Sequence, residues 1–167
     1  MYLKEGVYTA LVTPFKDDKS ICWDTLGHLI RGQVSIVQGI VLLGTTGESP
    51  TLSLLEKKAL VKYVCQKVNN QCQVVVGVGG NNTQDVIEFT DYCKEYADAL
   101  LVTVPNYNKP TQEGIFQHFK VIAESTTLPI MMYNIPSRCG VNMTSETVAR
   151  LYKINNIVAI KEAAGSI

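Results

Sequence analysis

The chain has 167 residues, 46% of them hydrophobic, and its fifteen acidic and fifteen basic residues give a formal net charge of zero at pH 7. This composition is typical of a soluble globular protein with a substantial core, and without a long run of either charge it predicts no nucleic-acid and no membrane-surface partner. No apolar stretch reaches the length of a membrane span, and residues 1–5 lack the hydrophobic segment of a signal peptide, so we expect a cytoplasmic protein.

The cysteines and histidines predict neither disulfides nor a metal site. The chain has five cysteines, an odd number, and no two of them form a CxxC pair. Reduced thiols are the simplest interpretation, and two histidines offer few ligands for zinc.

The sequence repeats one pattern of apolar strand, polar loop and amphipathic helix. Ser53 and Glu56 form a capping box at the start of one helix, Thr83 and Thr111 precede two others, and Thr144 or Ser145 begins the last. In the first of these helices, residues 54, 61, 64, 65 and 68 are expected to share the buried side. The predicted strands are residues 7–13, 39–43, 74–78, 99–104, 130–133 and 157–161.

Strict alternation of strands and helices predicts a parallel sheet covered by helices. Two architectures fit this pattern, an open doubly wound sheet and a closed (β/α)8 barrel, and the periodicity of the sequence does not distinguish them. Because an eight-stranded barrel typically needs about 250 residues, six strands form either a complete open α/β domain or a barrel without its last two units.

Functional sites of parallel α/β folds form at the carboxyl ends of the strands. Lys161 closes the apolar run 157–160, where it must bury its charge, find a partner or lose its proton, unless it is simply a solvated lysine beyond the strand. A neutral lysine is a nucleophile for carbonyl carbons. Tyr107 and Tyr133 place phenols at two further strand ends, where they either transfer protons or serve the core.

The remaining candidates are groups that bind anions. Thr45 and Thr46 stand between two glycines, in a turn that either holds a small carboxylate or is ordinary loop structure. Arg138 carries a fixed positive fork suited to a carboxylate, although surface arginines are equally common. An amine, two phenols, a threonine pair and a guanidinium on one rim predict imine chemistry on a small keto acid.

The glycine-rich stretch 77–80 does not predict a nucleotide cofactor. It lacks the third glycine of the dinucleotide fingerprint, and no Walker lysine and hydroxyl pair follows it. We interpret it as a turn between strand and helix that requires close backbone approach.

Five stretches together carry a family resemblance. GVYTALVTPF at 6–15, GTTGESPTLS at 44–53, PNYNKPTQEGIFQHF at 105–119, YNIPSRCG at 133–140 and IVAIKEAAG at 157–165 resemble, in order, the dihydrodipicolinate synthase family of class I pyruvate-dependent aldolases and lyases. The resemblance implies a (β/α)8 TIM barrel. Residues 1–167 would then form a partial catalytic domain with barrel strands one to six, while strands seven and eight and the C-terminal helical region are absent.

The resemblance also implies catalytic roles. Lys161 would form a Schiff base with pyruvate, and Tyr133 would donate and accept protons at the imine and the condensing carbon. Thr45 and Tyr107 would complete a proton relay to solvent, with Tyr107 reaching in from a neighbouring subunit. The burial of Lys161 in the barrel would favour its neutral, nucleophilic form.

The implied reaction condenses pyruvate with L-aspartate-4-semialdehyde in the diaminopimelate route to lysine, without a cofactor. Thr46 would hold the pyruvate carboxylate and Arg138 the carboxylate of the semialdehyde. The family assembly is a homotetramer, a dimer of dimers. The serine-arginine pattern after residues 134–136 favours this branch over N-acetylneuraminate lyases and keto-deoxy-sugar aldolases, which share the lysine and the tyrosine.

Two departures from the family pattern matter. Feedback-inhibited members often carry histidines where this chain has Leu54 and Lys57, and a tyrosine where it has Asn106, so we expect weak or absent inhibition by lysine. The family also continues for roughly another hundred residues, which leaves a second hypothesis: a truncated, non-catalytic remnant or assembly partner that needs another chain.

Overall fold

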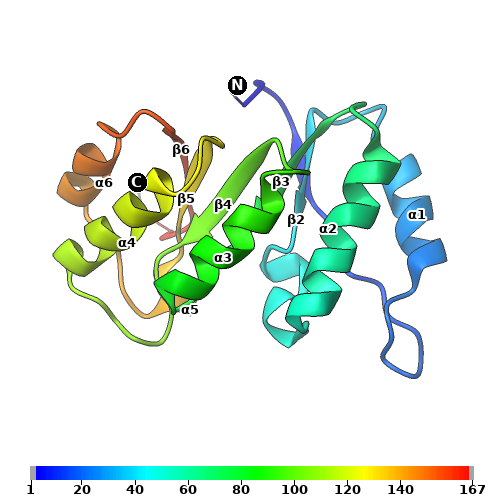
Figure 1. Cartoon of the computed structure of the whole chain (residues 1–167), viewed down its shortest axis with the longest axis horizontal. Helices are drawn as coiled ribbons and strands as arrows, with labels where there is room; N and C mark the ends of the chain where they lie inside the picture. Colours follow the sequence, from blue (N-terminus) through cyan, green and yellow to red (C-terminus); the bar gives the residue numbers. More distant parts are fainter. Residues whose placement is uncertain (1–2, 166–167) are drawn as a thin grey trace.

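One parallel sheet organises the chain. The computed structural model describes residues 3–165 (Figure 1). Each strand pairs in parallel with the strand before it, so the spatial order is the order in the chain. A doubly wound sheet reverses its strand order at a switch point, whereas a barrel does not, so this sheet is the first part of a barrel. The strands are β1 (Tyr8–Ala10), β2 (Gly39–Leu42), β3 (Gln73–Gly77), β4 (Ala99–Thr103), β5 (Ile130–Asn134) and β6 (Ile157–Glu162).

The helices cover the outer face of this sheet. In Figure 1, α2, α3 and α4 lie side by side along the curved sheet, with α1 beside α2 and α6 beside α4. No helix within residues 3–165 is long and apolar enough to cross a membrane. The helices are α1 (Trp23–Arg31), α2 (Leu54–Val68), α3 (Thr83–Cys93), α4 (Gln112–Glu124), α5 (Pro136–Cys139) and α6 (Ser145–Leu151), with the 3-10 turns η1 (Thr45–Gly47) and η2 (Ser49–Thr51).

The predicted helix starts are confirmed, with one difference. The capping box of Ser53 and Glu56 is complete, and Thr111 and Thr144 cap α4 and α6. At α3, however, Asn82 is the cap, because its side-chain oxygen accepts a hydrogen bond from the backbone amide of Gln84 at 3.0 Å. Thr83 is the first helical residue instead.

Two predicted burial patterns at the ends of elements are wrong. Leu54 is 53% exposed, because it occupies the first residue of α2, whereas the buried side of the helix is formed by Leu60, Val61, Val64 and Val68. The predicted strand 7–13 shortens to Tyr8–Ala10, with Val7 and Val12 60% and 45% exposed. β1 pairs with β2 alone, so its ends are less constrained than those of the interior strands.

Gly77, the last residue of β3, and Gly79, two residues beyond it, are required by close approach, as the sequence predicted. A β-carbon at Gly77 would overlap with the backbone carbonyl group of Leu43, at the end of the neighbouring strand β2. Gly79 lies in the same way against Thr103, which ends β4. The two glycines therefore allow three strand ends to meet at one edge of the sheet.

Gly77→Ala should therefore destabilise the fold by about 2 kcal/mol, because a backbone obstacle cannot rotate away as a side chain can. Urea unfolding of the variant would measure this loss. Gly44→Ala is the matched control, since a β-carbon there would lie 3.8 Å from the Val41 side chain, an ordinary contact. Equal stability of the two variants would contradict the close-approach interpretation.

A buried histidine joins α3 to α4. His118 is 4% exposed, and its Nδ1 lies 2.8 Å from the hydroxyl of Thr83, which explains why Thr83 is turned inward and does not cap α3. Burial lowers the pKa of His118 from 6.5 to about 4, against a smaller opposing effect of the Thr103 backbone. The imidazole is therefore neutral in the folded protein at neutral pH.

Stability should consequently fall as the pH falls from about 6.5 to about 4, by a total of about 3 kcal/mol. In that range the unfolded chain binds a proton at this histidine and the folded chain does not; above it the full stability is present. Urea unfolding across the range should show a flatter profile for His118→Gln. His28→Gln, at an exposed position, should keep the slope, and an unchanged profile in His118→Gln would refute the assignment.

Candidate functional site

The carboxyl ends of the strands surround a cavity of about 270 Å³. Three of the predicted site residues, Thr45, Tyr133 and Arg138, line it. The other lining residues are Leu43, Gly44, Ser49, Pro50, Gly77, Gly79, Leu101, Thr103, Asn106, Ile135 and Cys139. The cavity therefore joins groups from the ends of four strands, β2 to β5, and from the loops that follow them.

Lys161 does not line this cavity itself but lies against Tyr133, which does. The two residues are register partners on β5 and β6, and side chains of partners in a ladder point to the same face. The Lys161 Nζ lies 4.2 Å from the centroid of the Tyr133 ring, within the range of a cation–π contact. An amine is thereby held against the phenol that forms one wall of the cavity.

The burial that we expected for Lys161 is not found. Tyr133 is only 5% exposed, but the Lys161 side chain is exposed. β6 is an edge strand that pairs with β5 alone, so its other side has no neighbour within residues 3–165. The structure therefore orients the Lys161 amine toward Tyr133 but leaves it in contact with water.

The threonine pair lies in a fixed turn. Thr45 and Thr46 begin the 3-10 turn η1, which ends as Glu48 adopts a left-handed conformation (φ 54°). The hydroxyl of Thr13, beyond β1, donates a hydrogen bond of 2.7 Å to the carbonyl of Gly47 and holds this turn in place. Thr45 lines the cavity, whereas Thr46 is exposed and is not among its lining residues.

Arg138 comes from the short helix α5, directly after β5. Pro136 starts this helix and Gly140, with φ 75°, ends it, so the chain turns back over the cavity. Arg138 is exposed and makes no ion pair within residues 3–165, which leaves its guanidinium available for an anion. Burial raises the pKa of the neighbouring Cys139 thiol, so this thiol stays protonated.

Tyr107, like Thr46 and Lys161, is not among the residues that line the cavity. It is 86% exposed and has a left-handed backbone (φ 65°) in the loop between β4 and α4. The side-chain amide of the next residue, Asn108, donates a hydrogen bond of 2.9 Å to the backbone carbonyl of Asn81. The loop is thus anchored while the Tyr107 side chain remains exposed to solvent.

Sequence reasoning missed several lining residues, chiefly Thr103, Cys139 and Ser49. Thr103 is the last residue of β4, so reading the final strand residue as well as the loop would have identified it. Cys139 follows Arg138 in a four-residue helix that the motif alone did not predict.

A second cavity of about 480 Å³ lies between the starts of α2 and α3. Leu54 and Lys57 of α2 line it together with Asn81 and Asp85. Partial burial lowers the pKa of Lys57. Two of the three positions at which the family pattern is broken therefore lie in this second cavity, whereas the third, Asn106, lines the first.

The chemistry of the first cavity follows from its groups. Within the described residues, no group of three or more His, Cys, Asp or Glu side chains is placed to hold a metal ion. The site instead combines a primary amine, a phenol, a hydroxyl and a guanidinium. An amine can form an imine with a ketone, a phenol can move the protons, and a guanidinium can bind a carboxylate.

Comparison with known proteins gives a consistent result. The model of the "Dihydrodipicolinate synthetase family" matches residues 3–167. The 4-hydroxy-tetrahydrodipicolinate synthases of Parabacteroides distasonis and Azobacteroides pseudotrichonymphae are 48% and 51% identical to the chain, over 98% and 97% of its length. The chloride-inhibited dihydrodipicolinate synthase of Acinetobacter baumannii, solved in complex with pyruvate, is 41% identical over 97% of the chain, with a TM-score of 0.93. The chain spans 56% of the length of each of these three proteins.

Proposed function

Because the chain belongs to the dihydrodipicolinate synthetase family, we propose that it carries the pyruvate-binding part of a 4-hydroxy-tetrahydrodipicolinate synthase. The observation that carries this proposal is the placement of the Lys161 amine 4.2 Å from the centroid of the Tyr133 ring, beside a cavity that also exposes Thr45 and Arg138. The relative from Acinetobacter baumannii binds pyruvate, a keto acid of the size that a cavity of about 270 Å³ accepts.

The proposed reaction begins when Lys161 Nζ attacks the keto carbon of pyruvate and water leaves, which gives an imine. In this step the phenol of Tyr133 gives its proton to the departing water, which leaves a phenolate. The imine withdraws electrons, so the methyl group then loses a proton to this phenolate and forms an enamine. The enamine carbon then attacks the aldehyde of L-aspartate-4-semialdehyde. The amino group of that substrate displaces Lys161 from the imine, which closes the ring and restores the free lysine.

The two carboxylates of the substrates need separate positive or hydrogen-bonding partners. In the proposed arrangement Arg138 binds the carboxylate of the semialdehyde, since its guanidinium is free and lines the cavity. Thr46 and the η1 amides bind the pyruvate carboxylate, and Thr45 passes protons from Tyr133. Tyr107, exposed on its own chain, would complete the relay in a neighbouring subunit of a homotetramer.

Residues 1–167 would supply the first six strands of the catalytic barrel, with the seventh and eighth strands joining the open edges of the sheet. The exposed apolar side chains of the edge strand β6 support this assignment. Val158 and Ile160 are each 37% exposed, and Val7 beside β1 is 60% exposed. Exposed apolar residues on an edge strand favour pairing with a further segment.

The proposal predicts that pyruvate followed by borohydride gives one stable adduct on Lys161. Reduction converts the imine into an amine, which intact mass and peptide mapping locate. Lys161→Ala should abolish the adduct, whereas Lys153→Ala, at an exposed lysine elsewhere, should keep it. An adduct that persists in Lys161→Ala would refute the assignment of the nucleophile.

The same experiment separates the second hypothesis, a partner that is inactive without a complementary segment. The exposure of Lys161 is the observation that favours it, because an exposed amine lacks the desolvation that imine formation at neutral pH requires. A folded chain that traps no pyruvate alone, but does so after addition of a segment with the last two strands, would support the partner hypothesis.

The second cavity predicts that millimolar lysine neither binds nor inhibits. Leu54 and Lys57 stand in this cavity where feedback-inhibited members often carry histidines, and no histidine is among its lining residues. The ammonium groups of Lys57 and Lys58 balance the carboxylates of Asp85 and Glu88, so the cavity has no excess negative charge to hold free lysine. Thermal unfolding should show no upward shift with lysine, and the rate of trapping should not change. A clear shift in the wild-type chain, removed by Asp85→Asn, would contradict this prediction.

A further inference from the structure

A polar pair lies directly behind Lys161 and Tyr133. Asn134 and Glu162 are the next register partners on β5 and β6, and alternate side chains of a strand point to opposite faces. The Asn134 Nδ2 lies 2.9 and 3.1 Å from the two carboxylate oxygens of Glu162. Asn134 is only 2% exposed, so the amide end of this hydrogen bond is buried, whereas the Glu162 side chain is exposed.

Both members of the pair have further partners. Asn134 Oδ1 accepts a hydrogen bond of 3.1 Å from the amide of Met143, and its Nδ2 also donates to the Asn142 side chain at 2.8 Å. The amide of Ala164 donates to Glu162 at 2.8 Å. Every donor to this carboxylate within residues 3–165 is therefore uncharged.

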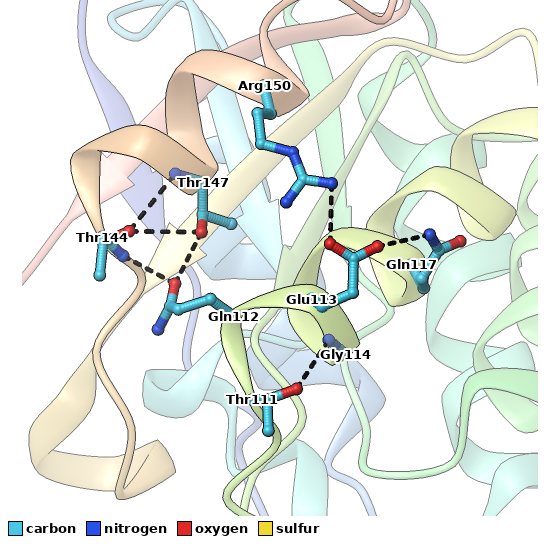
Figure 2. A network of polar contacts seen from close by, with 8 residues as sticks. All are labelled: Thr111, Gln112, Glu113, Gly114, Gln117, Thr144, Thr147 and Arg150. Carbon is cyan, nitrogen blue, oxygen red and sulfur yellow. Dashed lines mark hydrogen bonds and ion pairs between the residues drawn. The ribbon is translucent and has the colours of Figure 1, made fainter.

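The pair is anchored to the helices through Gln112, the first residue of α4. Its side-chain amide donates to the carbonyl of Asn142 at 2.8 Å. Figure 2 shows its oxygen accepting hydrogen bonds from the Thr144 amide and the Thr147 hydroxyl, at 3.0 and 2.7 Å. A continuous series of hydrogen bonds thus connects the end of β6 to α4 and α6.

The backbone pairing of β5 and β6 continues to this end of the sheet, where the amide of Ala163 donates a hydrogen bond of 2.9 Å to the carbonyl of Asn134. The register between β5 and β6 shifts between Ile130 and Met131. The ladder therefore contains an irregularity shortly before the pair of Tyr133 and Lys161. Within residues 3–165, β6 has one neighbouring strand, β5. The four pairs past the irregularity keep one register, and the side-chain bond of the last pair adds to this backbone ladder at its end.

We propose that Asn134 is a positioning residue, which holds the carboxylate of Glu162 and thereby fixes the Lys161 amine against Tyr133. This proposal rests on the proposed function. The bond acts on the opposite face of the same two strands, one residue beyond the reacting pair. An imine forms fast only when the amine approaches the carbonyl at a defined angle, so a loose strand end slows the reaction without removing any reacting group.

The test first removes the hydrogen-bond donor of the pair and then exchanges donor and acceptor between positions 134 and 162. Asn134→Asp places two carboxylates together, which repel and remove the donor, so imine trapping should slow about fivefold at neutral pH. As the pH falls the pair takes up a shared proton, a hydrogen bond forms again, and the rate relative to wild type should recover. The double variant Asn134→Asp with Glu162→Gln reverses donor and acceptor, and should restore the neutral-pH rate.

Other charged groups do not interfere with this pair. The nearest elements carry Arg138 on α5, Glu113, His118, Lys120 and Glu124 on α4, and Glu146 and Arg150 on α6. None of these makes an ion pair or hydrogen bond with Asn134 or Glu162 in the described part of the chain. Glu113 and Arg150 instead pair with each other at 2.8 Å (Figure 2).

Asn156→Asp is the matched control for loss of a structural asparagine. Asn156 precedes β6 at the opposite end and donates hydrogen bonds of 2.9 Å to the carbonyls of Ala123 and Thr126. Its variant should unfold at lower temperature, while its trapping rate should keep the pH profile of the wild-type chain. A pH-dependent loss of trapping rate that occurs only in Asn134→Asp, and that is absent from the double variant, supports the positioning role of Asn134.

Hydrogen exchange across residues 157–164 provides a readout that does not need the reaction. Asn134→Asp should exchange faster than wild type at neutral pH, and the double variant should be protected again. A wild-type chain that traps no pyruvate, either alone or with a segment that carries the last two strands, would refute the proposed function, and exchange would still test the pair. Trapping and exchange that are equal in Asn134→Asp and wild type, or a double variant without rescue, would overturn the proposal.

Discussion

The pairing of β5 with β6 is the interaction on which the site depends. It is a parallel ladder in which Tyr133 meets Lys161 and Asn134 meets Glu162. One pair contains the Lys161 amine and the Tyr133 phenol proposed to react, while the other, on the opposite face of the two strands, contains the hydrogen bonds between Asn134 and Glu162. A strand shifted by one residue would move Lys161 to the helix face, since side chains alternate.

The approach of neighbouring strands shapes the cavity that this ladder borders. Gly77 and Gly79 lack side chains where Leu43 and Thr103 approach, so the ends of β2, β3 and β4 meet around one space. The hydrogen bond from Thr13 then holds the η1 turn over the opening. The packing of the interior strands therefore determines the shape of the cavity, because the residues that allow the strands to approach also line it.

Much of the site could be predicted from the sequence, because the rule that sites form at the carboxyl ends of parallel strands selects Thr45, Tyr133 and Lys161 directly. The residues that could not be predicted depend on contacts distant in sequence. Thr83 forms a hydrogen bond with a histidine on the next helix and does not cap its own. Asn134 was visible as a strand-end residue, but its partner Glu162 lies 28 positions away, and no local pattern relates the two.

The exposure of Lys161 separates two requirements of imine catalysis that are often treated as one. The first is direction: the ladder, the Tyr133 ring and the Asn134–Glu162 bond place the amine within residues 3–165. The second is desolvation, which an edge strand cannot provide because one of its sides has no neighbour. Desolvation of a lysine depends on what covers it, whereas its direction depends on the strand from which it projects. Within residues 3–165 the ladder supplies the first of the two, so six strands can hold the Lys161 amine against Tyr133 while its side chain stays exposed to water.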